Sequence, residues 1–595
     1  MIGGYAGKLL WVDLTSGKVE ANDRHLPMAR DFIGGRGLGS RLLWDLLPAG
    51  TDPLAAESPL IFLTGPLTGL VPGGAHTAVV HKSPATRITL GHAITGAQWG
   101  TELKTAGFDG LVVTGKAEKP VYIAVEDGKA EVRDAAWLWG RRTLATEVAL
   151  KEAMADPRLR VLCIGPAGEN LVTFASIQQE YFRSAARGGA GMLMGSKRLK
   201  AITVRGHGPI PVAQPETFAA RHGDMLSKLR GARTRRRGYG LVRWGSTISH
   251  DPHSDVSELD VRNYREGYWS QVDEIGGLEY ERRCKVRSRS CFACPICCLQ
   301  TGVLREGPHA GTLTNPDFDS FGTIGPGCLV TDFAGAHYLS ALGDDLGMDN
   351  ASLGNVVGFA MECYERGLLT KADCDGLELT WGNVAAMESL WGKIARREGI
   401  GALLAEGTRS AAEKIGRGAE TFAMHAKGLS FAGYTPTAHP DRALQYAVGD
   451  RGGCHHYGLN LEEQNARAWA DSLTCCAWHR AMLSPAEYLG LLSAATGWEY
   501  SPDDWNEIAW RLLIMARAFN IREGMVPTRD DVLPARVHDD PLTQGPLAGT
   551  RYPREDFLRD RAEWYAVRGC DEQGYPTRAT LERLGLGFVH DQGTV

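Results

Sequence analysis

Apolar and polar residues alternate in short runs over the first third of the chain. These runs are rich in aliphatic and β-branched residues and are bounded by glycine or other turn residues, which is typical of strands in a sheet. The predicted strands cover residues 8–14, 59–65, 110–115, 121–125, 160–165 and 201–205. One longer helical pattern, residues 144–154, interrupts them. We therefore expect a sheet-rich domain over residues 1–206.

From about residue 210, apolar residues recur every three to four positions, the period of an amphipathic helix. The predicted helices cover residues 215–230, 332–346, 351–366, 383–398, 400–415, 461–478, 485–497 and 503–523. The segment Gly206-His-Gly-Pro-Ile-Pro211 is a plausible linker, and a second boundary is expected near Gly416. We expect an α+β protein in which the β-rich domain 1–206 precedes two mostly helical domains, 207–416 and 417–595. The sequence shows no internal repeat.

Composition narrows the class of protein. The chain has 595 residues, of which 43% are hydrophobic and 23% charged, as in ordinary globular proteins. A net charge of −5 gives no general attraction to nucleic acid, and no apolar run is long enough to cross a membrane. The start of the chain lacks the pattern of a secretory signal, so we expect a cytoplasmic protein whose thiols bind metal or stay free.

Glycine is unusually frequent, at 73 residues. Clusters occur at Gly34-Gly-Arg-Gly-Leu-Gly39, Pro72-Gly-Gly74 and Arg187-Gly-Gly-Ala-Gly191. Backbone amides in such loops can bind phosphate, with arginine adding charge. The first cluster lacks the G-x-G-x-x-G spacing and the βαβ unit of a dinucleotide site. Each cluster alone is consistent with a turn, whereas several together favour a large, phosphate-rich cofactor.

The strongest charge cluster is the basic run of residues 228–237. A run of this kind is most often a solvated helix end and loop. The alternative is a docking face for an acidic partner or a phosphate-bearing ligand.

Four cysteines lie within eight residues, in Cys291-Phe-Ala-Cys294-Pro-Ile-Cys297-Cys298. Thiolates at this spacing can converge on one soft metal centre. Zinc is an alternative, but zinc sites usually have a second close pair of ligands, and none follows here. Three close cysteines and one remote one indicate an iron–sulfur cluster, while zinc and unligated thiols remain open.

Two segments share a pattern at the ends of predicted helices. They are Asp344-Asp-Leu-Gly347-Met-Asp349 and Asp471-Ser-Leu-Thr474-Cys475-Cys476. Acidic groups at such ends can accept hydrogen bonds from the N–H groups of a heterocycle. A single match would be read as a helix C-cap, whereas the pair indicates two related half-sites.

Two further groups carry titratable side chains suited to proton transfer. The turn Arg451-Gly-Gly-Cys places His455 and His456 after it, and histidine titrates near neutral pH. A structural pair of histidines is the alternative. Asp317 and Asp319 follow the cysteine run, and two-residue spacing on an extended segment would put both carboxylates on one side. Their alternative is a solvated loop.

Many of these segments, in the same order, make the chain resemble the tungsten-containing aldehyde:ferredoxin oxidoreductases nearly end to end. The matching segments are residues 34–39, 59–69, 102–109, 164–171, 187–197, 291–298, 344–349, 518–524 and 574–577. The resemblance implies a β-rich base that holds two pterin cofactors and two helical domains that close over it. It also implies tungsten, or molybdenum, held by four dithiolene sulfurs of two pyranopterins. A [4Fe–4S] cluster lies alongside, with Mg²⁺ between the pterin phosphates.

The resemblance also implies roles for individual residues. Cluster ligands would be Cys291, Cys294, Cys298 and Cys476. The pterins would be bound by Gly96, Arg183, Ser184, Ala186, Arg187, Asp344, Gly347, Asp349, Arg451, Asp471 and Cys475. His455 matches the active-site histidine of the family, and Asp319 the better of two candidates for its acidic partner.

The chain departs from the family pattern at several of these positions. Ile94 stands where the family has a pterin-binding asparagine, and His76 where it often has an arginine. Thr474 replaces a glycine. Both aspartates of the Pro316-Asp-Phe-Asp319 segment replace glutamates. The shorter side chain moves the carboxylate by about 1 Å, which can change the reaction rate or the choice of substrate. The prediction of the cofactor is unaffected, whereas the prediction of an aldehyde substrate is weakened.

The resemblance implies oxidation of an aldehyde to a carboxylic acid, with electrons leaving to ferredoxin or a small Fe–S subunit, in a homo- or hetero-oligomer. One alternative on the same fold is a reductase subunit acting on an aromatic-ring coenzyme A thioester, which uses an extra cysteine near its metal. Cys328 is a candidate for that role, but its sequence context differs from that of the extra cysteine. The other alternative is a non-catalytic Fe–S or zinc-bearing subunit, which would need neither the paired aspartate motifs nor the glycine–arginine loops.

Overall fold

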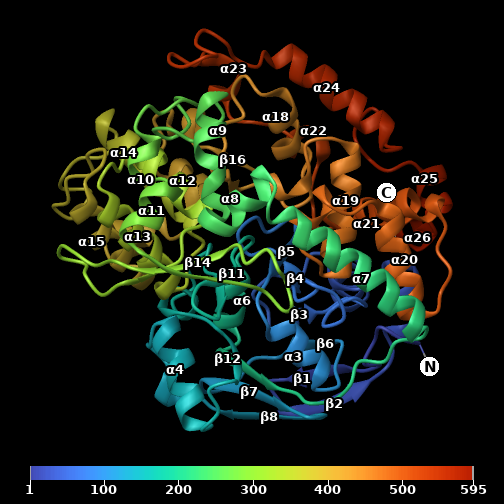
Figure 1. The fold of residues 1–595 in the computed structure, drawn as a ribbon. Helices are drawn as coiled ribbons and strands as arrows, with labels where there is room; N and C mark the ends of the chain where they lie inside the picture. Colours follow the sequence, from blue (N-terminus) through green and yellow to red (C-terminus); the bar gives the residue numbers. More distant parts are fainter. Residues whose placement is uncertain (1, 592–595) are drawn as a thin grey trace.

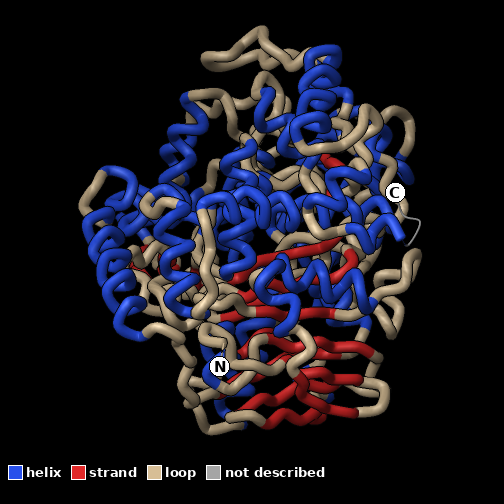
Figure 2. The backbone as a smooth tube through the Cα atoms, turned by 90° about the vertical axis from the view of Figure 1, so that its right-hand side faces the viewer, coloured by secondary structure: helices blue, strands red, loops and turns tan. Residues whose placement is uncertain are grey.

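The strands gather at one end of the molecule and helices cover them. The computed structural model describes residues 2–591, without the side chains of residues 236–238 and 591. Figure 1 shows the blue and cyan strands of the first 206 residues as a base, with the later helices above it. Figure 2 shows the same division as red strands below and mostly blue helices above. The expected α+β class and the sheet-rich first third are confirmed.

The base consists of two six-stranded sheets. The first contains β1 (Leu9–Asp13), β2 (Lys18–Asn22), β3 (Leu60–Leu63), β4 (Thr77–Lys82), β5 (Leu90–Thr95) and β6 (Gly110–Thr114), in the order β2-β1-β6-β3-β4-β5. The second contains β7 (Val121–Glu126), β8 (Lys129–Asp134), β9 (Arg160–Cys163), β10 (Ile177–Gln179), β11 (Arg183–Ala185) and β12 (Leu199–Arg205), in the order β8-β7-β12-β9-β10-β11. One buried apolar cluster draws side chains from both sheets, so the sheets share a core.

The two sheets have the same topology. Each has one parallel pair, β1 with β6 and β7 with β12, and its other pairs are antiparallel. Helices α2 (Gly35–Leu46) and α4 (Thr143–Ala153) precede β3 and β9, and α3 (Trp99–Thr105) and α6 (Ala190–Ser196) precede β6 and β12. The base is therefore an internal duplication, and the expectation of no repeat was wrong. Many apolar sequences satisfy one strand topology, so the repeat is visible in the structure and not in the sequence.

Helices follow the predicted periodicity over most of the remaining chain. Those that matter for the site are α7 (Pro215–Ala232), α8 (Arg236–Trp244), α11 (Gly277–Arg283), α12 (Phe318–Cys328), α13 (Phe333–Leu346), α14 (Asn350–Glu365), α19 (Leu461–Leu473), α20 (Pro485–Thr496) and α21 (Pro502–Arg522). None of the helices that the structure describes is long and apolar enough to cross a membrane.

Three predicted elements differ from the structure. In two of them a residue with positive φ ends or divides the helix. The helix predicted for residues 400–415 is two helices, α16 (Ile400–Leu404) and α17 (Gly407–Ile415), because Gly407 has a φ of +82°. The helix predicted to reach residue 478 ends at Leu473, because Thr474 adopts the left-handed region at φ +53°. The segment Gly34–Gly39, read as a glycine loop, instead forms the start of α2.

A small three-stranded sheet carries the cysteine run. Strands β13 (Lys285–Arg289) and β14 (Leu299–Val303) pair antiparallel, and residues 290–298 connect them. Apolar clusters cross both expected domain boundaries, joining base residues to α19 and α21 and joining Val172 to Phe422. The division at residues 206 and 416 stays a prediction.

Candidate cofactor and active site

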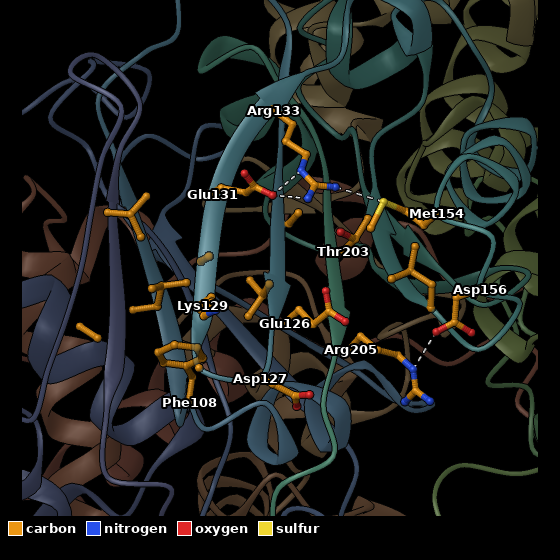
Figure 3. Close-up of a pocket in the computed structure, with 18 of the residues that line it drawn as sticks. Phe108, Glu126, Asp127, Lys129, Glu131, Arg133, Met154, Asp156, Thr203 and Arg205 are labelled. Carbon is orange, nitrogen blue, oxygen red and sulfur yellow. Dashed lines mark hydrogen bonds and ion pairs between the residues drawn. The ribbon is translucent and has the colours of Figure 1, made fainter.

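Two of the cavities in the described part of the chain have very different linings. One, of about 800 Å³, lies in the base. Figure 3 shows that its charged residues pair with one another, as in Arg133 with Glu131 and Arg205 with Asp156. No residue expected to bind a cofactor lines it. This cavity has the character of a charged surface hollow between strands.

The other cavity, of about 260 Å³, lies where the base meets the helices, and almost every predicted site residue lines it. These residues are Gly96, Arg183, Ser184, Ala186, Arg187, Cys291, Cys298, Asp319, Asp344, Asp349, Arg451, His455, Asp471, Cys475 and Cys476. Ile94 and His76, the two departures from the family pattern, line it too. Cys294 and Gly347 are not among its lining residues; the first lies behind the other thiols and the second caps α13.

The two helix-end motifs face this cavity from opposite halves of the base. Gly347 caps the C-terminus of α13 and Thr474 caps that of α19, and both residues adopt the left-handed conformation. After each turn, the chain forms an isolated antiparallel bridge with the base, Met348 with Ala175 and Cys475 with Gly74. The motifs are thus docked in the same way onto the two halves of the duplicated base.

Two glycines make this docking possible. A Cβ on Gly65 would lie 2.5 Å from the carbonyl carbon of Leu473, and one on Gly165 would lie 2.4 Å from the carbonyl oxygen of Leu346. Both glycines follow an equivalent strand, β3 or β9, and both precede a proline. Any side chain at either position would push a helix end off the base.

The thiols expected to bind the cluster gather beside the base. The backbone N–H of Ala97 donates to Sγ of Cys291 at 3.3 Å, and Nε2 of His479 lies 3.6 Å from Sγ of Cys294. Burial, together with the neighbouring cysteines, raises the pKa of Cys294, Cys298 and Cys476 to about 12. Arg183 lies nearby and lowers the pKa of Cys298 and Cys476 against the effect of burial. A metal cluster would supply the further positive charge that a set of buried thiolates needs. The sulfur of Cys297 instead points to the carbonyl oxygen of Cys294, at 3.7 Å.

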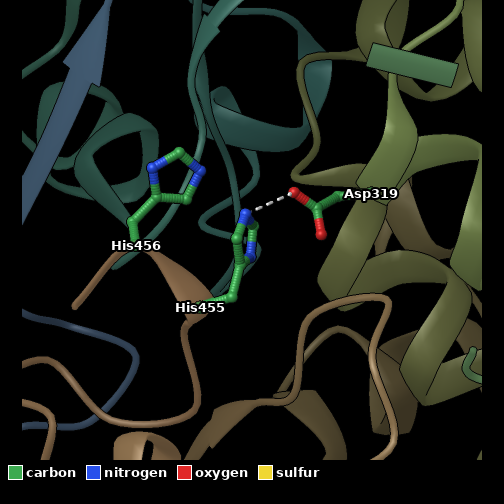
Figure 4. A group of neighbouring side chains, drawn as sticks. All are labelled: Asp319, His455 and His456. Atoms are coloured by element: carbon green, nitrogen blue, oxygen red, sulfur yellow. Dashed lines mark ion pairs between the residues drawn. The ribbon is translucent and has the colours of Figure 1, made fainter. Parts of the chain in front are cut away.

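Asp319 and His455 form the acid–base pair of the site. Oδ2 of Asp319 lies 3.5 Å from Nε2 of His455, and His456 completes the group (Figure 4). Burial, followed by the charge of Asp317, raises the pKa of Asp319 to about 7. Burial, followed by His456, holds the pKa of His455 well below its ordinary value. The pair therefore combines a neutral imidazole with a carboxyl group that titrates near neutral pH.

Asp317 has a different place. Its carboxylate caps the N-terminus of α12 by accepting from the N–H of Asp319 at 3.1 Å, and it accepts from the hydroxyl of Ser246 at 3.3 Å. Both residues line the cavity, and the helix begins between them. Of the two, Asp319 is the one that faces His455.

Several buried polar atoms at the cavity have no hydrogen-bond partner in the described part of the chain. They include Nε of Arg183, Nε of Arg187 and Oε1 of Gln178. Arg187 is fixed by Asp349 at 3.2 Å, and the amide of Gln178 donates to Asp344 at 3.3 Å. Burial raises the pKa of Asp344 well above its ordinary value. Since buried polar atoms are normally paired, this set is suited to a polar ligand rich in donors and acceptors.

The sequence reasoning missed some residues of the site and misplaced one segment. Arg467 lines the cavity one helical turn before Asp471, and the i,i+4 spacing on α19 was a signal for it. Asn315 and Trp478 also line it, without a sequence signal. The segment Gly34–Gly39 does not line the cavity, so its reading as a phosphate loop was wrong. The guanidinium of its Arg36 instead lies 3.8 Å from the carboxylate of Asp471 and so contacts the helix-end motif of residues 471–476.

Comparisons with known proteins agree with this architecture. Residues 9–206 match the N-terminal domain of aldehyde ferredoxin oxidoreductase, and residues 231–586 match domains 2 and 3. The chain is 34% identical to the tungsten-containing aldehyde ferredoxin oxidoreductase of Pyrococcus furiosus, covering 98% of this chain and 99% of that one. It is 35% identical to the aliphatic sulfonate oxidoreductase WOR-like subunit of the same organism, covering 98% and 97%.

A solved structure is also similar. The active site complex BamBC of benzoyl coenzyme A reductase, in complex with 1,5-dienoyl-CoA, matches with a TM-score of 0.85 and 27% identity, over 100% of this chain and 98% of that chain. The family matches cover most of the sequence, and the expected fold and enzyme class are confirmed with them. The chain therefore belongs to the aldehyde ferredoxin oxidoreductase family of oxidoreductases.

Proposed function

We propose that the chain oxidises an aldehyde to a carboxylic acid at a tungsten bis-pyranopterin centre, and that a [4Fe–4S] cluster carries the electrons to a ferredoxin. The observation that carries the proposal is the convergence of the two helix-end motifs, the thiols and the Asp319–His455 pair on one cavity. Side chains do not distinguish tungsten from molybdenum here, because the pterin sulfurs would hold the metal.

The residues present fit this cofactor. Asp344 and Asp471 lie at equivalent helix ends, where each can accept from the N–H groups of one pterin. Arg183 and Arg187 bring unpartnered N–H groups that suit phosphate oxygens. The tungsten centre, when bound, would supply two-electron redox chemistry. The Mg²⁺ between the pterin phosphates stays a prediction.

The spacing of the thiols supports a cluster over zinc. Four sulfurs at about 2.3 Å from one tetrahedral zinc ion lie only about 3.8 Å from each other. Among the described residues, no three cysteine sulfurs lie within 4.8 Å of one another. Sulfurs that bind four separate irons lie further apart, as here.

The side chains of the pair handle the protons. Conversion of an aldehyde and water to a carboxylic acid releases two electrons and two protons. Neutral His455 donates its Nε2–H to the carbonyl oxygen and so favours addition of the oxygen nucleophile. Asp319, with its pKa near 7, accepts a proton from the adding water and returns it to solvent.

His76 changes the charge of the site. Burial, followed by Arg183, lowers the pKa of His76 to about 3, so its ring is neutral at physiological pH. A Cβ on Gly96 would lie 3.1 Å from the His76 ring and 3.0 Å from Sγ of Cys291, so the ring and this thiol are both close to Gly96. The site is thus less positive than one with arginine there.

The second candidate function is reduction of an aromatic-ring coenzyme A thioester, which the similarity to benzoyl coenzyme A reductase favours. Cys328 does not supply the extra metal ligand of that branch. Its side chain is fully buried in α12, its Sγ faces the carbonyl oxygens of Thr323 and Gly354 at 3.5 Å, and it does not line the cavity. It is therefore not placed to serve as the extra metal ligand of that branch.

Metal analysis followed by an activity screen tests the proposal. Anaerobically purified protein is expected to contain one tungsten or molybdenum and about four irons per chain. An aldehyde should reduce a viologen dye in its presence, whereas a reduced dye should not reduce an aromatic coenzyme A thioester. Turnover of the thioester alone would establish the second function. Zinc or iron without tungsten or molybdenum would indicate the non-catalytic alternative.

A further inference from the structure

We propose that the surface over the cysteine loop is the docking site of a small acidic Fe–S electron carrier, and that the arginines of the α7–α8 region steer it there. This inference rests on the proposed function, since it names where the electrons leave. It concerns a surface outside the cavity and develops the docking alternative for the basic run of residues 228–237.

The cysteine loop lies directly beneath this surface. It is the connection at the end of the β13–β14 hairpin, and Ala293 at its tip is exposed. Ala232 at the end of α7 and Leu241 of α8 form one buried apolar cluster with Cys294 and Ile296. The end of α7 and helix α8 therefore pack over the thiols, and α8 contacts β14, beside which it lies in Figure 1.

The charge of this layer has one sign. Residues 225–250 contain seven lysines and arginines and no aspartate or glutamate, in a chain whose net charge is −5. Arg230, Arg233 and Arg235 are exposed, and none of the described carboxylates forms an ion pair with them. The side chains of Arg236 and Arg237 lie outside the described residues. Arg287 of β13, also exposed and without an ion pair among the described residues, adds a fourth cation about 13 Å along the strand from Cys291.

Nearby cations that do have acidic partners mark the edge of the surface. Lys228 pairs with Glu487 at 2.6 Å, Arg243 with Glu281 at 2.6 Å, and Arg282 with Glu279 at 2.7 Å. Arg230, Arg233, Arg235 and Arg287 are the exposed arginines of this surface that no described carboxylate pairs with. A cluster of like charges raises the electrostatic energy of the folded chain, and an acidic partner would lower it.

Exposed apolar side chains lie among these charges. Tyr239 of α8, Leu278 of α11 and Val286 of β13 expose 51%, 54% and 61% of their surface, and α8 packs against α11 and β14. A small apolar centre with a charged rim is suited to a transient protein complex, because the charges speed encounter and the apolar contact is easily released. The weak complexes of redox proteins have interfaces of this small size.

Charge reversal at Arg233 and Arg235 tests the proposal. The double variant R233E/R235E should oxidise aldehyde with viologen dye at the wild-type rate, because the dye needs no docking surface. With a small acidic [4Fe–4S] ferredoxin as acceptor, its KM should rise by about tenfold or more, and its dependence on salt should weaken. The matched control is K116E/K119E, which reverses two exposed lysines of the base and should behave as wild type with both acceptors.

A wild-type KM and salt dependence for ferredoxin in R233E/R235E would overturn the proposal. Binding of the metal-loaded protein to immobilised ferredoxin, measured by surface plasmon resonance, tests the docking site even where the enzyme shows no activity, because binding needs no turnover. The double variant can also lose dye activity. In that case, a larger loss of ferredoxin affinity in R233E/R235E than in K116E/K119E supports the docking site, and wild-type affinity rejects it. If the wild type oxidises no aldehyde with either acceptor, the proposed function fails, and the binding experiment still decides the surface.

Discussion

Asp349 and Cys476 occupy equivalent positions on the two halves of the base. The backbone N–H of Asp349 donates to the carbonyl oxygen of Phe174 at 2.9 Å, and that of Cys476 donates to the carbonyl oxygen of Gly73 at 3.1 Å. The same backbone anchor therefore presents a carboxylate on one side and a thiol on the other. A duplicated scaffold has in this way become asymmetric in chemistry, with the proposed cluster beside only one of the two proposed pterin sites.

The pH dependence of turnover should report the Asp319 carboxyl. Its pKa is raised to about 7, so the group is protonated below that pH and cannot accept a proton. We expect kcat/KM for the aldehyde to rise with pH and level off above about 7. Asp319→Asn should lower kcat about 10²- to 10⁴-fold and remove the inflection near pH 7, with metal content unchanged. Steady-state kinetics between pH 5.5 and 9 measure this, and an unchanged profile in the variant would rule out the assigned role.

Cys297 and Cys298 provide a matched pair for the cluster. Cys298→Ser should reduce iron and acid-labile sulfide well below four per chain and abolish the electron paramagnetic resonance signal of the reduced cluster. Cys297→Ser should retain both, because the Cys297 sulfur points to the Cys294 carbonyl and away from the cavity. The opposite outcome, with iron lost only in the Cys297 variant, would reassign the ligand.

Gly165 is expected to tolerate no side chain. Gly165→Ala places a Cβ 2.4 Å from the carbonyl oxygen of Leu346. The resulting shift of α13 should cost about 1–3 kcal/mol in the free energy of unfolding and lower the tungsten or molybdenum content. Gly223→Ala in α7, where a Cβ would meet nothing within 4 Å, should instead stabilise the chain by about 0.5–1 kcal/mol. Chemical denaturation and metal analysis of both variants provide the check, and equal stabilities would refute it.

A buried ion pair network should make the fold sensitive to acid. Asp531 is fully buried, and Lys427 and Arg517 lie 2.7 Å and 2.9 Å from it. These partners lower its pKa to about 2 against the opposing effect of burial. Because the folded pKa lies below the unfolded value of about 3.9, this stabilisation is present above pH 4 and is lost as pH falls through about 2.

Substitution of the same residue gives a test at neutral pH. Asp531→Asn leaves two buried cations without a counter-charge and should cost about 3–5 kcal/mol in the free energy of unfolding. The exposed Asp373→Asn should change it by less than about 0.5 kcal/mol. Denaturation of both variants at pH 7 compares them, and a small effect in the Asp531 variant would show that the network contributes little.

Local spacing in the sequence determined much of this protein. The period of apolar residues predicted α13, α14, α20 and α21 closely, although α14 is buried on all sides over residues 350–363. The dense cysteines indicated a metal centre for a similar reason, since three ligands within eight residues need no long-range contact to meet. Helix-end motifs and the cysteine run carried the family resemblance as well.

The tertiary structure decided whatever depends on segments far apart in the chain. Asp319 and His455 are 136 residues apart, and only the packing of α12 against the turn after Arg451 selects Asp319 over Asp317. The fully buried position of Cys328, the direction of the Cys297 sulfur and the duplication of the base likewise follow from packing. Periodicity and spacing describe the surroundings of a residue along the chain, whereas a catalytic cavity is formed by side chains from many segments, which come together only when their apolar faces are buried in a common core.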